Sequence, residues 1–310
     1  MAKILAIDVG GTKIAYAVID ENGKFLIEIQ RIATPKDIKN LKITFENIIK
    51  TFEKEIDAVA FATAGAVNLS NTKVESSTAN MPEGYHLIDF STLTNKPVYV
   101  ENDANAAAWA EYKVGAAQGE NNTITITLGT GVGGGFIVDG KLLRGKSGRG
   151  GEVGHIKINS RNRKCTCGRK NCFECYASGT GLKRTAEEIA ETNEIFKSGI
   201  YKNKNPKDIT TYDITEGVKQ NDKYSLEVFN IWKQDIITGI SGIVNIFDPD
   251  SVIISGGMGE YINTEEIQNA VNAQNVVSPV KIKHAKAGNN AGMIGAALLA
   301  AEKLLYNKNK

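Results

Sequence analysis

Apolar and polar residues alternate along this chain with two distinct periods. Short apolar runs, each followed by glycine or polar residues, are typical of buried strands, and they occupy residues 3–8, 14–20, 57–62, 97–100, 123–128, 136–138 and 251–255. Apolar residues at three-to-four spacing, or an alanine-rich composition, predict helices at 38–56, 104–114, 179–197, 213–247 and 291–305. Residues 24–30 follow a tight turn at Asn22-Gly23 and predict one more strand. Because strands and helices alternate, the pattern predicts α/β layers.

One arrangement, a strand followed by a glycine turn and a second strand, occurs twice. The first copy turns at Gly10-Gly11-Thr12, and the second turns within the glycine-rich segment 129–135. The copies lie roughly 120 residues apart, a weak internal repeat that is too degenerate for a solenoid. With 310 residues, the chain is longer than one usual domain. We therefore predict two domains, residues 1–115 together with 291–310, and residues 116–290.

Composition and charge narrow the class of protein. A formal charge of +2 gives no electrostatic reason for nucleic acid or a membrane surface to be the main partner. The longest apolar stretch, 291–300, is far too short to span a bilayer, and the apolar start of the chain predicts a strand and not a signal peptide. Clustered cysteines without a signal favour a reducing cytoplasm and metal ligation; a disulfide framework is the alternative.

All four cysteines lie within eleven residues, and a histidine precedes them in the order His155-x9-Cys165-x-Cys167-x4-Cys172-x2-Cys175. Crowded thiolates in a chain without other cysteines predict zinc, which takes about four nitrogen and sulfur donors in a tetrahedron. Either all four cysteines, or the histidine with the first three cysteines, supply such a set. The zinc-binding loop, 155–175, carries or adjoins Glu152 and Glu174, so the metal would brace carboxylates that contact a substrate.

The glycines at 129, 131 and 134 satisfy the dinucleotide-binding pattern G-x-G-x-x-G. That pattern needs a helix directly after the loop, whereas residues 136–138 predict a strand, which argues against a Rossmann site. A P-loop is excluded because no Gly-Lys-Ser/Thr follows the glycines. A glycine turn between strands still binds phosphate, because successive N–H groups converge on an anion. Thr12 and Thr130 add hydroxyl donors and Asp8 adds a carboxylate; a simple glycine-rich hairpin is the alternative.

Five motifs occur in order along nearly the whole chain: Asp8-Val-Gly-Gly-Thr-Lys13, Glu101-Asn-Asp-Ala-Asn105, Leu128-Gly-Thr-Gly-Val-Gly-Gly-Gly135, Glu152-Val-Gly-His155 and Cys165-x-Cys-Gly-x3-Cys172-x-Glu174. Each motif alone is modest, but the ordered set resembles the ROK family of bacterial sugar kinases and sugar-responsive repressors. The resemblance implies an α/β protein with the two-domain actin-like (ribonuclease H-like) hexokinase fold and an active-site cleft between the domains. ATP and Mg2+ would bind on one side and a hexose on the other, in what the family suggests is a homodimer.

Residue roles follow from the same resemblance. Asp103 is the implied catalytic base; because it lies where a strand meets a helix, we expect the helix dipole to keep it ionised, and a helix N-cap is its alternative role. The residues implied at ATP, its phosphates and Mg2+ are Asp8, Gly10, Gly11, Thr12, Lys13, Thr130, Gly131, Gly133, Gly256 and Gly257. The residues implied at the sugar are Gly65, Thr78, Asn80, Asn102, Asp103, Glu152, His155 and Glu174. The implied ligands of a structural Zn2+ are His155, Cys165, Cys167 and Cys172.

Three classes of function compete. A repressor of the same family needs a helix-turn-helix before the first glycine turn, and only seven residues precede Asp8. A zinc-ribbon binding module predicts a small basic domain, which does not match a chain of 310 residues with near-neutral charge. We therefore expect a sugar kinase, which phosphorylates the 6-hydroxyl of a hexose with ATP.

The choice of hexose rests on two details of the sequence. The nine residues between His155 and Cys165 resemble the spacing in N-acetylmannosamine kinases, whereas the family's glucokinases often have one more. Residues 62–67 also lack the proline that is common there in glucokinases. We expect N-acetylmannosamine, in sialic acid catabolism, with glucose and N-acetylglucosamine as alternatives. Ala66 is small enough to leave room for an N-acetyl group.

Overall fold

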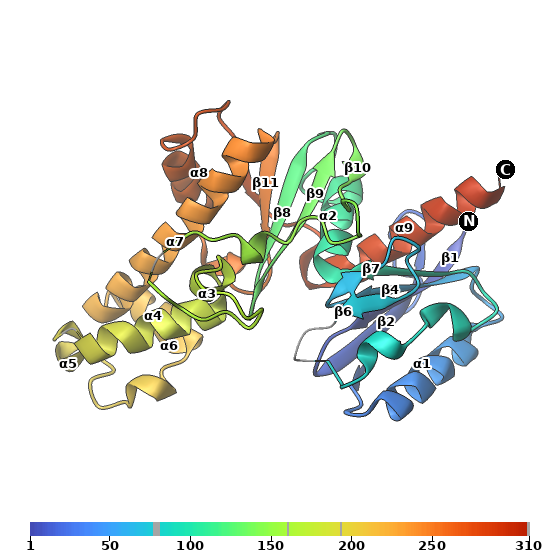
Figure 1. Ribbon diagram of the computed structural model, residues 1–310, viewed down its shortest axis with the longest axis horizontal. Helices are drawn as coiled ribbons and strands as arrows, with labels where there is room; N and C mark the ends of the chain where they lie inside the picture. Colours follow the sequence, from blue (N-terminus) through green and yellow to red (C-terminus); the bar gives the residue numbers. More distant parts are fainter. Residues whose placement is uncertain (77–80, 160, 193, 309–310) are drawn as a thin grey trace. The chain divides into compact units, whose positions relative to one another are not determined.

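A five-stranded sheet forms from the apolar runs in the first third of the chain (Figure 1). In the computed structural model, which describes residues 1–76, 81–159, 161–192 and 194–308, its strand order is β3-β2-β1-β4-β7. The strands are β1 Lys3–Val9, β2 Lys13–Asp20, β3 Gln30–Ala33, β4 Ala58–Thr63 and β7 Val98–Asn102. β1 pairs with β2 in the antiparallel sense, whereas β1, β4 and β7 run parallel. The carboxyl ends of these three strands therefore lie at one edge of the sheet.

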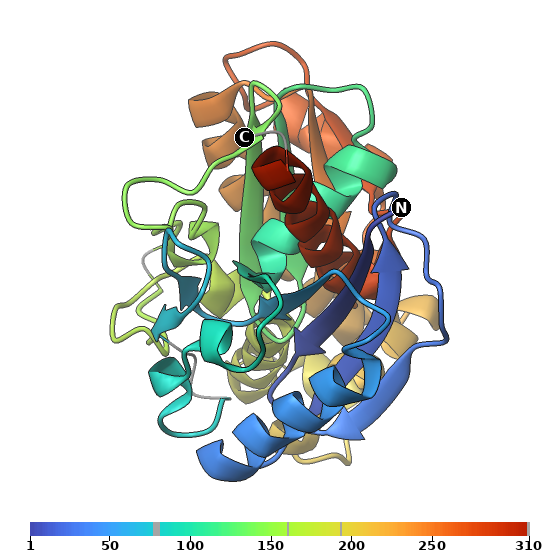
Figure 2. The same cartoon turned by 90° about the vertical axis from the view of Figure 1, so that its right-hand side faces the viewer.

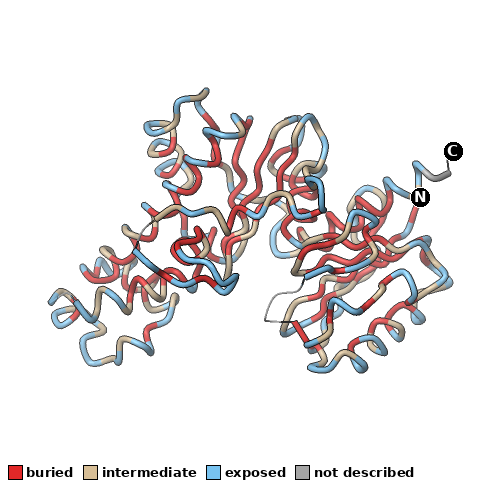
Figure 3. The backbone as a smooth tube through the Cα atoms, in the orientation of Figure 1, coloured by how far each residue is buried: buried red, intermediate tan, exposed pale blue. Residues whose placement is uncertain are grey.

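Helices cover both faces of this sheet (Figure 2). α1, Ile38–Phe52, lies on one face, and α2, Asp103–Val114, lies with α9, Ala291–Lys308, on the other. Successive residues of β1 point to opposite faces, so Leu5 packs with α1 while Ile4 packs with α2 and α9. The interiors of β1, β2 and β4 are accordingly buried on both sides, whereas the edge strand β3 is mostly exposed (Figure 3).

A second five-stranded sheet has the order β10-β9-β8-β11-β12. Its strands are β8 Thr123–Leu128, β9 Val132–Val138, β10 Lys141–Leu142, β11 Ser251–Ser255 and β12 Lys281–His284. The long helix α7, Lys223–Phe247, packs beside α3, Glu174–Ala177, and α4, Gly179–Thr192. Trp232 on α7 donates its indole N–H to the carbonyl of Ala177 at 2.9 Å. This bond fixes α7 at the junction of α3 and α4.

Shorter elements complete the described structure. β5 Ala66–Val67 and β6 Val74–Ser76 form a separate antiparallel pair. The other α-helices are α5 Ile195–Ser198, α6 Thr211–Lys219 and α8 Thr264–Asn272. The 3-10 helices are Tyr85–Leu87, Phe90–Thr92, Val153–His155, Pro206–Asp208, Gly259–Tyr261 and Gly288–Asn290. Among the helices of the described residues, none combines the length and the apolar composition that crossing a membrane requires.

The contacts within the chain divide it into two compact units. The first comprises Met1–Thr125, Gly135–Gly151 and Ala285–Lys310, and the second comprises Ile126–Gly134 and Glu152–His284. The segment 135–151 goes with the first unit, whereas the division predicted from the sequence placed it in the second domain. The predicted domain boundaries stay a prediction.

The segment after the first hairpin differs from its prediction. The sequence predicts a strand over 24–30, but β3 begins only at Gln30. The Asp20 carboxylate accepts the backbone N–H groups of Asn22 and Lys24, both at 2.9 Å. These bonds close the turn over 20–24. Beyond it Phe25 forms an isolated bridge with Ile19, and the N–H of Leu26 donates to the Val18 carbonyl at 2.8 Å, without a continuous strand.

The helix predicted over 213–247 is in fact two helices, α6 and α7. Asn221 has a φ of 56°, which a helix does not accommodate, and Asp222 caps α7 by accepting the N–H of Ser225 at 2.9 Å. The helix predicted over 179–197 is likewise divided between α4 and α5. Apolar periodicity continues through these breaks because the helices on both sides bury their apolar faces.

Candidate functional site

The corner between β7 and α2 carries the predicted catalytic residue. Asn102 is the helix cap: its Oδ1 accepts the N–H groups of Ala104 and Asn105 at 3.0 and 3.1 Å, and its Nδ2 donates to the Gly65 carbonyl at 3.1 Å. The alternative role of Asp103 as N-cap is therefore wrong, because Asp103 is the first helical residue. One of its carboxylate oxygens accepts the N–H of Ala104 at 2.8 Å.

Asp8 lies at the same edge of the first sheet. β1, β4 and β7 end together, which brings Asp8 near the corner that carries Asp103. Burial raises the pKa of Asp8 to about 7; the Asp103 charge contributes to this rise, and the Lys13 charge opposes it. Gly292, near the start of α9, lies against this carboxylate, since an added Cβ would be 3.9 Å from its Oδ1.

The second carboxylate, Asp103, is perturbed in the same direction. The residue is exposed, yet the protein around it displaces bulk water, and this desolvation raises its pKa. The N–H of Ala104 opposes the rise without cancelling it. The helix N-terminus therefore does not fully offset the effect of desolvation on the pKa of Asp103, and the ionised state expected from the sequence stays a prediction. A raised pKa makes the carboxylate a better proton acceptor near neutral pH.

The first glycine turn, residues 10–12, is fixed by hydrogen bonds that its carbonyl groups accept. Thr34 donates its hydroxyl to the Gly10 carbonyl at 2.6 Å and its backbone N–H to the Thr12 carbonyl at 3.1 Å. The N–H of Gly10 donates to the Lys13 carbonyl at 3.0 Å. Within the described part of the chain, the N–H groups of Gly11 and Thr12 have no partner. The turn thus offers two adjacent donors to an anion.

The second glycine turn, residues 129–131, is held in a similar way. The N–H of Gly179 donates to the Gly129 carbonyl at 2.8 Å, and the Thr180 hydroxyl donates to the Thr130 carbonyl at 2.9 Å. The N–H groups of Thr130 and Gly131 lack a partner among the described residues. The glycine segment predicted over 129–135 is shorter than expected, because β9 begins at residue 132 and includes Gly133.

Glu174 connects this turn to the cysteine segment. It is the first residue of α3, and its Oε2 accepts the N–H of Val132 at 3.1 Å. A Cβ on Gly131 would lie 2.5 Å from the same oxygen. Its Oε1 lies 4.0 Å from the Sγ of Cys165. A side chain at position 131 would therefore have to displace the Glu174 carboxylate.

The glycines after β11 also have a packing role. Gly256 has a φ of 83°, and an added Cβ would lie 2.4 Å from the Leu128 carbonyl oxygen. The N–H of Met258 donates to that same carbonyl at 2.9 Å. Gly257 has no atom near the position of an added Cβ among the described residues. The turn at 256–257 thus packs on the end of β8, next to the second glycine turn.

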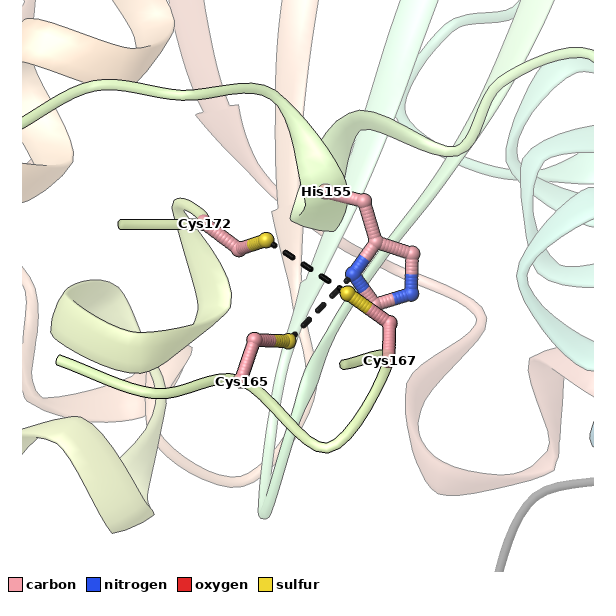
Figure 4. A group of neighbouring side chains, drawn as sticks. All are labelled: His155, Cys165, Cys167 and Cys172. Carbon is pink, nitrogen blue, oxygen red and sulfur yellow. Dashed lines mark hydrogen bonds between the residues drawn. The ribbon is translucent and has the colours of Figure 1, made fainter. Parts of the chain in front are cut away.

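Three cysteines and a histidine form a candidate metal centre (Figure 4). The donor atoms of His155, Cys165, Cys167 and Cys172 all lie within 4.8 Å of one another. The Sγ atoms of Cys167 and Cys172 are 3.6 Å apart, and Cys165 Sγ is 3.7 Å from His155 Nδ1. In a tetrahedron with Zn–S bonds of about 2.3 Å, donors lie roughly 3.8 Å apart. The four donors fit zinc in kind, number and spacing.

The fourth cysteine packs against this centre but is not one of its four donors. Cys175 Sγ is directed to the carbonyl of Lys164, at 3.5 Å. His155 therefore takes the place that a four-cysteine site would give to Cys175. The other ring nitrogen of His155, Nε2, lies 3.9 Å from an oxygen of Glu152. A carboxylate beside the second nitrogen is the arrangement that orients histidine ligands in metal sites.

The predicted sugar contacts belong to both units. Gly65 has a φ of 107°, which glycine accommodates, and its carbonyl is bound by Asn102. Both polar groups of the Asn102 side chain are bonded within the protein. Thr78 and Asn80 lie outside the described residues. The other predicted sugar contacts, which the second unit holds near the metal centre, are Glu152, His155 and Glu174.

Two buried charged residues were not given a role by the sequence. Glu111, at the end of α2, accepts the backbone N–H groups of Ala116, Lys286 and Ala287 at 2.7, 3.0 and 2.7 Å. It thereby fixes the chain just before the Gly288–Asn290 turn. Its only sequence signal is an acidic residue on an alanine-rich helix, and two of its three partners, Lys286 and Ala287, are remote along the chain.

Arg163 is the second such residue, and it braces the cysteine segment. Its guanidinium donates to the carbonyl of Cys175 at 2.9 Å, to the Thr185 hydroxyl at 2.8 Å and to Glu188 at 2.7 Å. It also lies 4.7 Å from the centre of the Tyr176 ring. These contacts stabilise the cysteine segment independently of the candidate metal donors.

Comparison with known proteins gives consistent relatives. A family model described as the ROK family matches residues 4–303. The chain is 33% identical to a glucokinase from Streptomyces coelicolor, over 97% of this chain and 98% of that protein. It is 32% identical to an N-acetylmannosamine kinase from Vibrio cholerae, over 95% of this chain and 98% of that protein. A solved ROK family glucokinase from Streptomyces griseus, in complex with glucose and AMPPNP, has a TM-score of 0.78 and 30% identity, over 97% of this chain and 100% of that chain. The family resemblance and the α/β actin-like hexokinase fold that it implied are confirmed.

Proposed function

The chain belongs to the ROK family, and we propose that it is an ATP-dependent sugar kinase that phosphorylates the 6-hydroxyl of a hexose as a homodimer. Relatives at 32–33% identity over nearly the whole chain are named as kinases of glucose and of N-acetylmannosamine. The observation that carries the proposal is the pair Asp8 and Asp103 at one sheet edge, beside a glycine turn with two available N–H groups. Positioning and charge neutralisation are what phosphoryl transfer requires.

Asp103 is proposed as the base. As the sugar 6-oxygen bonds to the terminal phosphorus of ATP, the bond from that phosphorus to the bridging oxygen breaks and ADP leaves, while the hydroxyl proton passes to the Asp103 carboxylate. Desolvation raises the pKa of this group, which brings its proton affinity closer to what a base at neutral pH needs. The Asn102 cap and its bond to Gly65 fix the junction of β7 and α2, which orients the Asp103 carboxylate.

Asp8 is proposed to hold Mg2+. A cation supplies charge neutralisation at the phosphates. The residues fit this role, because the burial that raises the pKa of Asp8 to about 7 leaves a carboxylate whose charge needs a cationic partner. Lys13 supplies one positive charge nearby. The two glycine turns bind the phosphates through their available N–H groups, with Thr12 and Thr130 as hydroxyl donors, and the Gly256-Gly257 turn borders the nucleotide.

Zinc is proposed as a structural ion. Four protein donors leave no position for a reactive water, so the ion would hold the segment between Glu152 and Glu174 in shape. Those two carboxylates, with His155, Gly65 and Asn102, would bind the sugar hydroxyls, since each carboxylate accepts from two hydroxyls.

N-acetylmannosamine is the proposed sugar, and glucose is the second candidate. The spacing between His155 and Cys165 and the absence of proline in 62–67 favour the first, while the 33% identity to a glucokinase favours the second. A coupled ADP-release assay on N-acetylmannosamine, glucose and N-acetylglucosamine tests both the kinase activity and the choice of sugar. The highest kcat/KM is expected for N-acetylmannosamine. A preference for glucose would reassign the sugar, and no ADP release with any hexose would remove the kinase function.

A further inference from the structure

Glu101, two residues before Asp103, is the centre of a buried polar network. The residue is 1% exposed. One carboxylate oxygen accepts the backbone N–H of Asn102 at 3.0 Å and the side-chain amide of Asn105 at 3.1 Å. The same two residues, Asn102 and Asn105, are the cap and the first turn of α2. Glu101 therefore contacts both sides of the corner that carries Asp103.

Arg144 is the cationic partner of this carboxylate. Its Nη2 donates to the other Glu101 oxygen, and its Nη1 donates to Asn71 Oδ1 at 2.5 Å. The guanidinium lies 5.4 Å from the centre of the Tyr99 ring, and the Tyr99 hydroxyl donates to Glu101 at 3.3 Å. Burial lowers the pKa of Arg144 to about 10, so it stays cationic at neutral pH. All these residues belong to the first unit.

Asn71 shows that this arrangement is built into the fold. It adopts a φ of 59°, is buried, and bonds to Val100 of β7 through both its side chain and its backbone. Its side-chain amide donates to the Val100 carbonyl at 2.8 Å, and its own carbonyl accepts the Val100 N–H at 2.8 Å. Asn71 thus presents its Oδ1 to Arg144 from a fixed position directly beside Glu101.

We propose that Arg144 is a positioning residue for Asp103, acting through Glu101. Burial already raises the pKa of Glu101 to about 7, and Arg144 is the cation bonded to it; without the guanidinium, Glu101 would take up a proton or turn away. Either change weakens its bonds to Asn102 and Asn105, which set the corner. A shift of about 1 Å at a reacting group can cost about 100-fold in rate. This inference rests on the proposed function of Asp103.

Variants of Arg144 test the proposal, with Arg149 as a matched control in the same segment. Arg149 pairs with Glu75 at 3.0 Å, and both side chains are nearly half exposed. We expect Arg144→Met to lower kcat by about 10–100-fold with KM for ATP within about twofold. Arg144→Lys keeps one charged bond to Glu101, so its kcat should be intermediate. Arg149→Met should have the kcat of the unmodified protein.

A folding defect is separated from a positioning defect by a double variant. The kcat of each variant is expressed per sugar-binding site, titrated by calorimetry, so that misfolded protein does not count. Arg144→Met with Glu101→Gln leaves no unpaired buried charge and keeps a side-chain oxygen for Asn102 and Asn105, so it should recover most of the kcat that Arg144→Met loses. A kcat of Arg144→Met within about twofold of normal, or a double variant no more active than Arg144→Met, would overturn the proposal. Asp103→Asn separates the two hypotheses. If it stays active, the proposed base fails; if it is inactive while Arg144→Met turns over normally, only the positioning role fails.

Discussion

Two glycine turns, residues 10–12 and 129–131, share one backbone design. In each, a threonine hydroxyl and a backbone N–H bind carbonyl oxygens of the turn, from Thr34 in the first case and from Thr180 and Gly179 in the second. In each, the two N–H groups that follow the first residue have no partner in the part of the chain that the structure describes. The design leaves adjacent donors for an anion.

The side chains around the turns differ. The first turn adjoins Asp8 and Lys13, whose charges interact with each other. The second is followed by Val132, whose N–H donates to Glu174, and Glu174 lies beside Cys165, a donor of the candidate metal centre. A repeated backbone therefore does not imply repeated chemistry. In the proposed kinase, the first turn belongs to the reacting centre, and the second is tied to the segment that zinc would hold.

The largest expected effect tests the reacting centre beside the first turn. Asp103→Asn keeps the volume of the side chain and leaves the Asn102 cap in place, but it removes the proton acceptor. We expect kcat to fall about 10²–10⁴-fold, measured by coupled ADP release. Calorimetric affinities for sugar and nucleotide should change little. Near-normal turnover would exclude Asp103 as the base.

The second-largest effect tests the candidate metal centre, which Glu174 connects to the second turn. Cys167→Ser removes one of four donors, so zinc should be lost and KM for the sugar should rise by about 10–100-fold. Cys175→Ser is the matched control, because Cys175 is not one of the four candidate donors and its Sγ is directed to the Lys164 carbonyl. Elemental analysis should find one zinc per chain in the unmodified protein and in this control. Full activity without zinc would contradict the structural role.

Most strands and the candidate metal donors could be predicted from the sequence, because their signals are local. Short apolar runs predict the strands, and crowded cysteines predict the metal donors, because both signals lie within a few residues. Thr34, Thr180 and Arg144 carried no signal, since their partners lie 24, 50 and 43 residues away. The break at Asp222 had a local cap signal that apolar periodicity concealed.

A smaller effect is expected in the stability of the protein without ligands. The folded-state pKa of Asp8 is raised from 3.8 to about 7, so the folded state holds the proton more tightly and loses stability as pH rises through this range. Asp8→Asn removes that loss. It should be more stable than the unmodified protein at pH 8 by about 1–2 kcal/mol, allowing for remaining solvent, and the difference should vanish near pH 4.

Chemical unfolding at pH 4 and pH 8 measures this difference. Glu28→Gln, at an exposed position, is the control for a change of net charge. The same Asp8→Asn protein should lose activity, because the proposed Mg2+ ligand is gone. An equal stability difference at both pH values would show that the Asp8 carboxylate is not destabilised by burial.

The smallest effect tests why the second turn contains glycine: because Glu174 lies close to it, or because the nucleotide does. A Cβ on Gly131 would lie 2.5 Å from Glu174 Oε2, whereas a Cβ on Gly129 has no described atom within 4 Å. The Glu174 carboxylate is the end of a flexible side chain, so Gly131→Ala should displace it and break its bond to Val132, at a cost of about 1 kcal/mol. We expect nucleotide affinity to weaken by up to about 10-fold, while Gly129→Ala changes it little. Calorimetry with a non-hydrolysable ATP analogue gives both values. If Gly129→Ala weakens nucleotide binding as much as Gly131→Ala, the turn requires glycine because the nucleotide approaches closely, and not because Glu174 does.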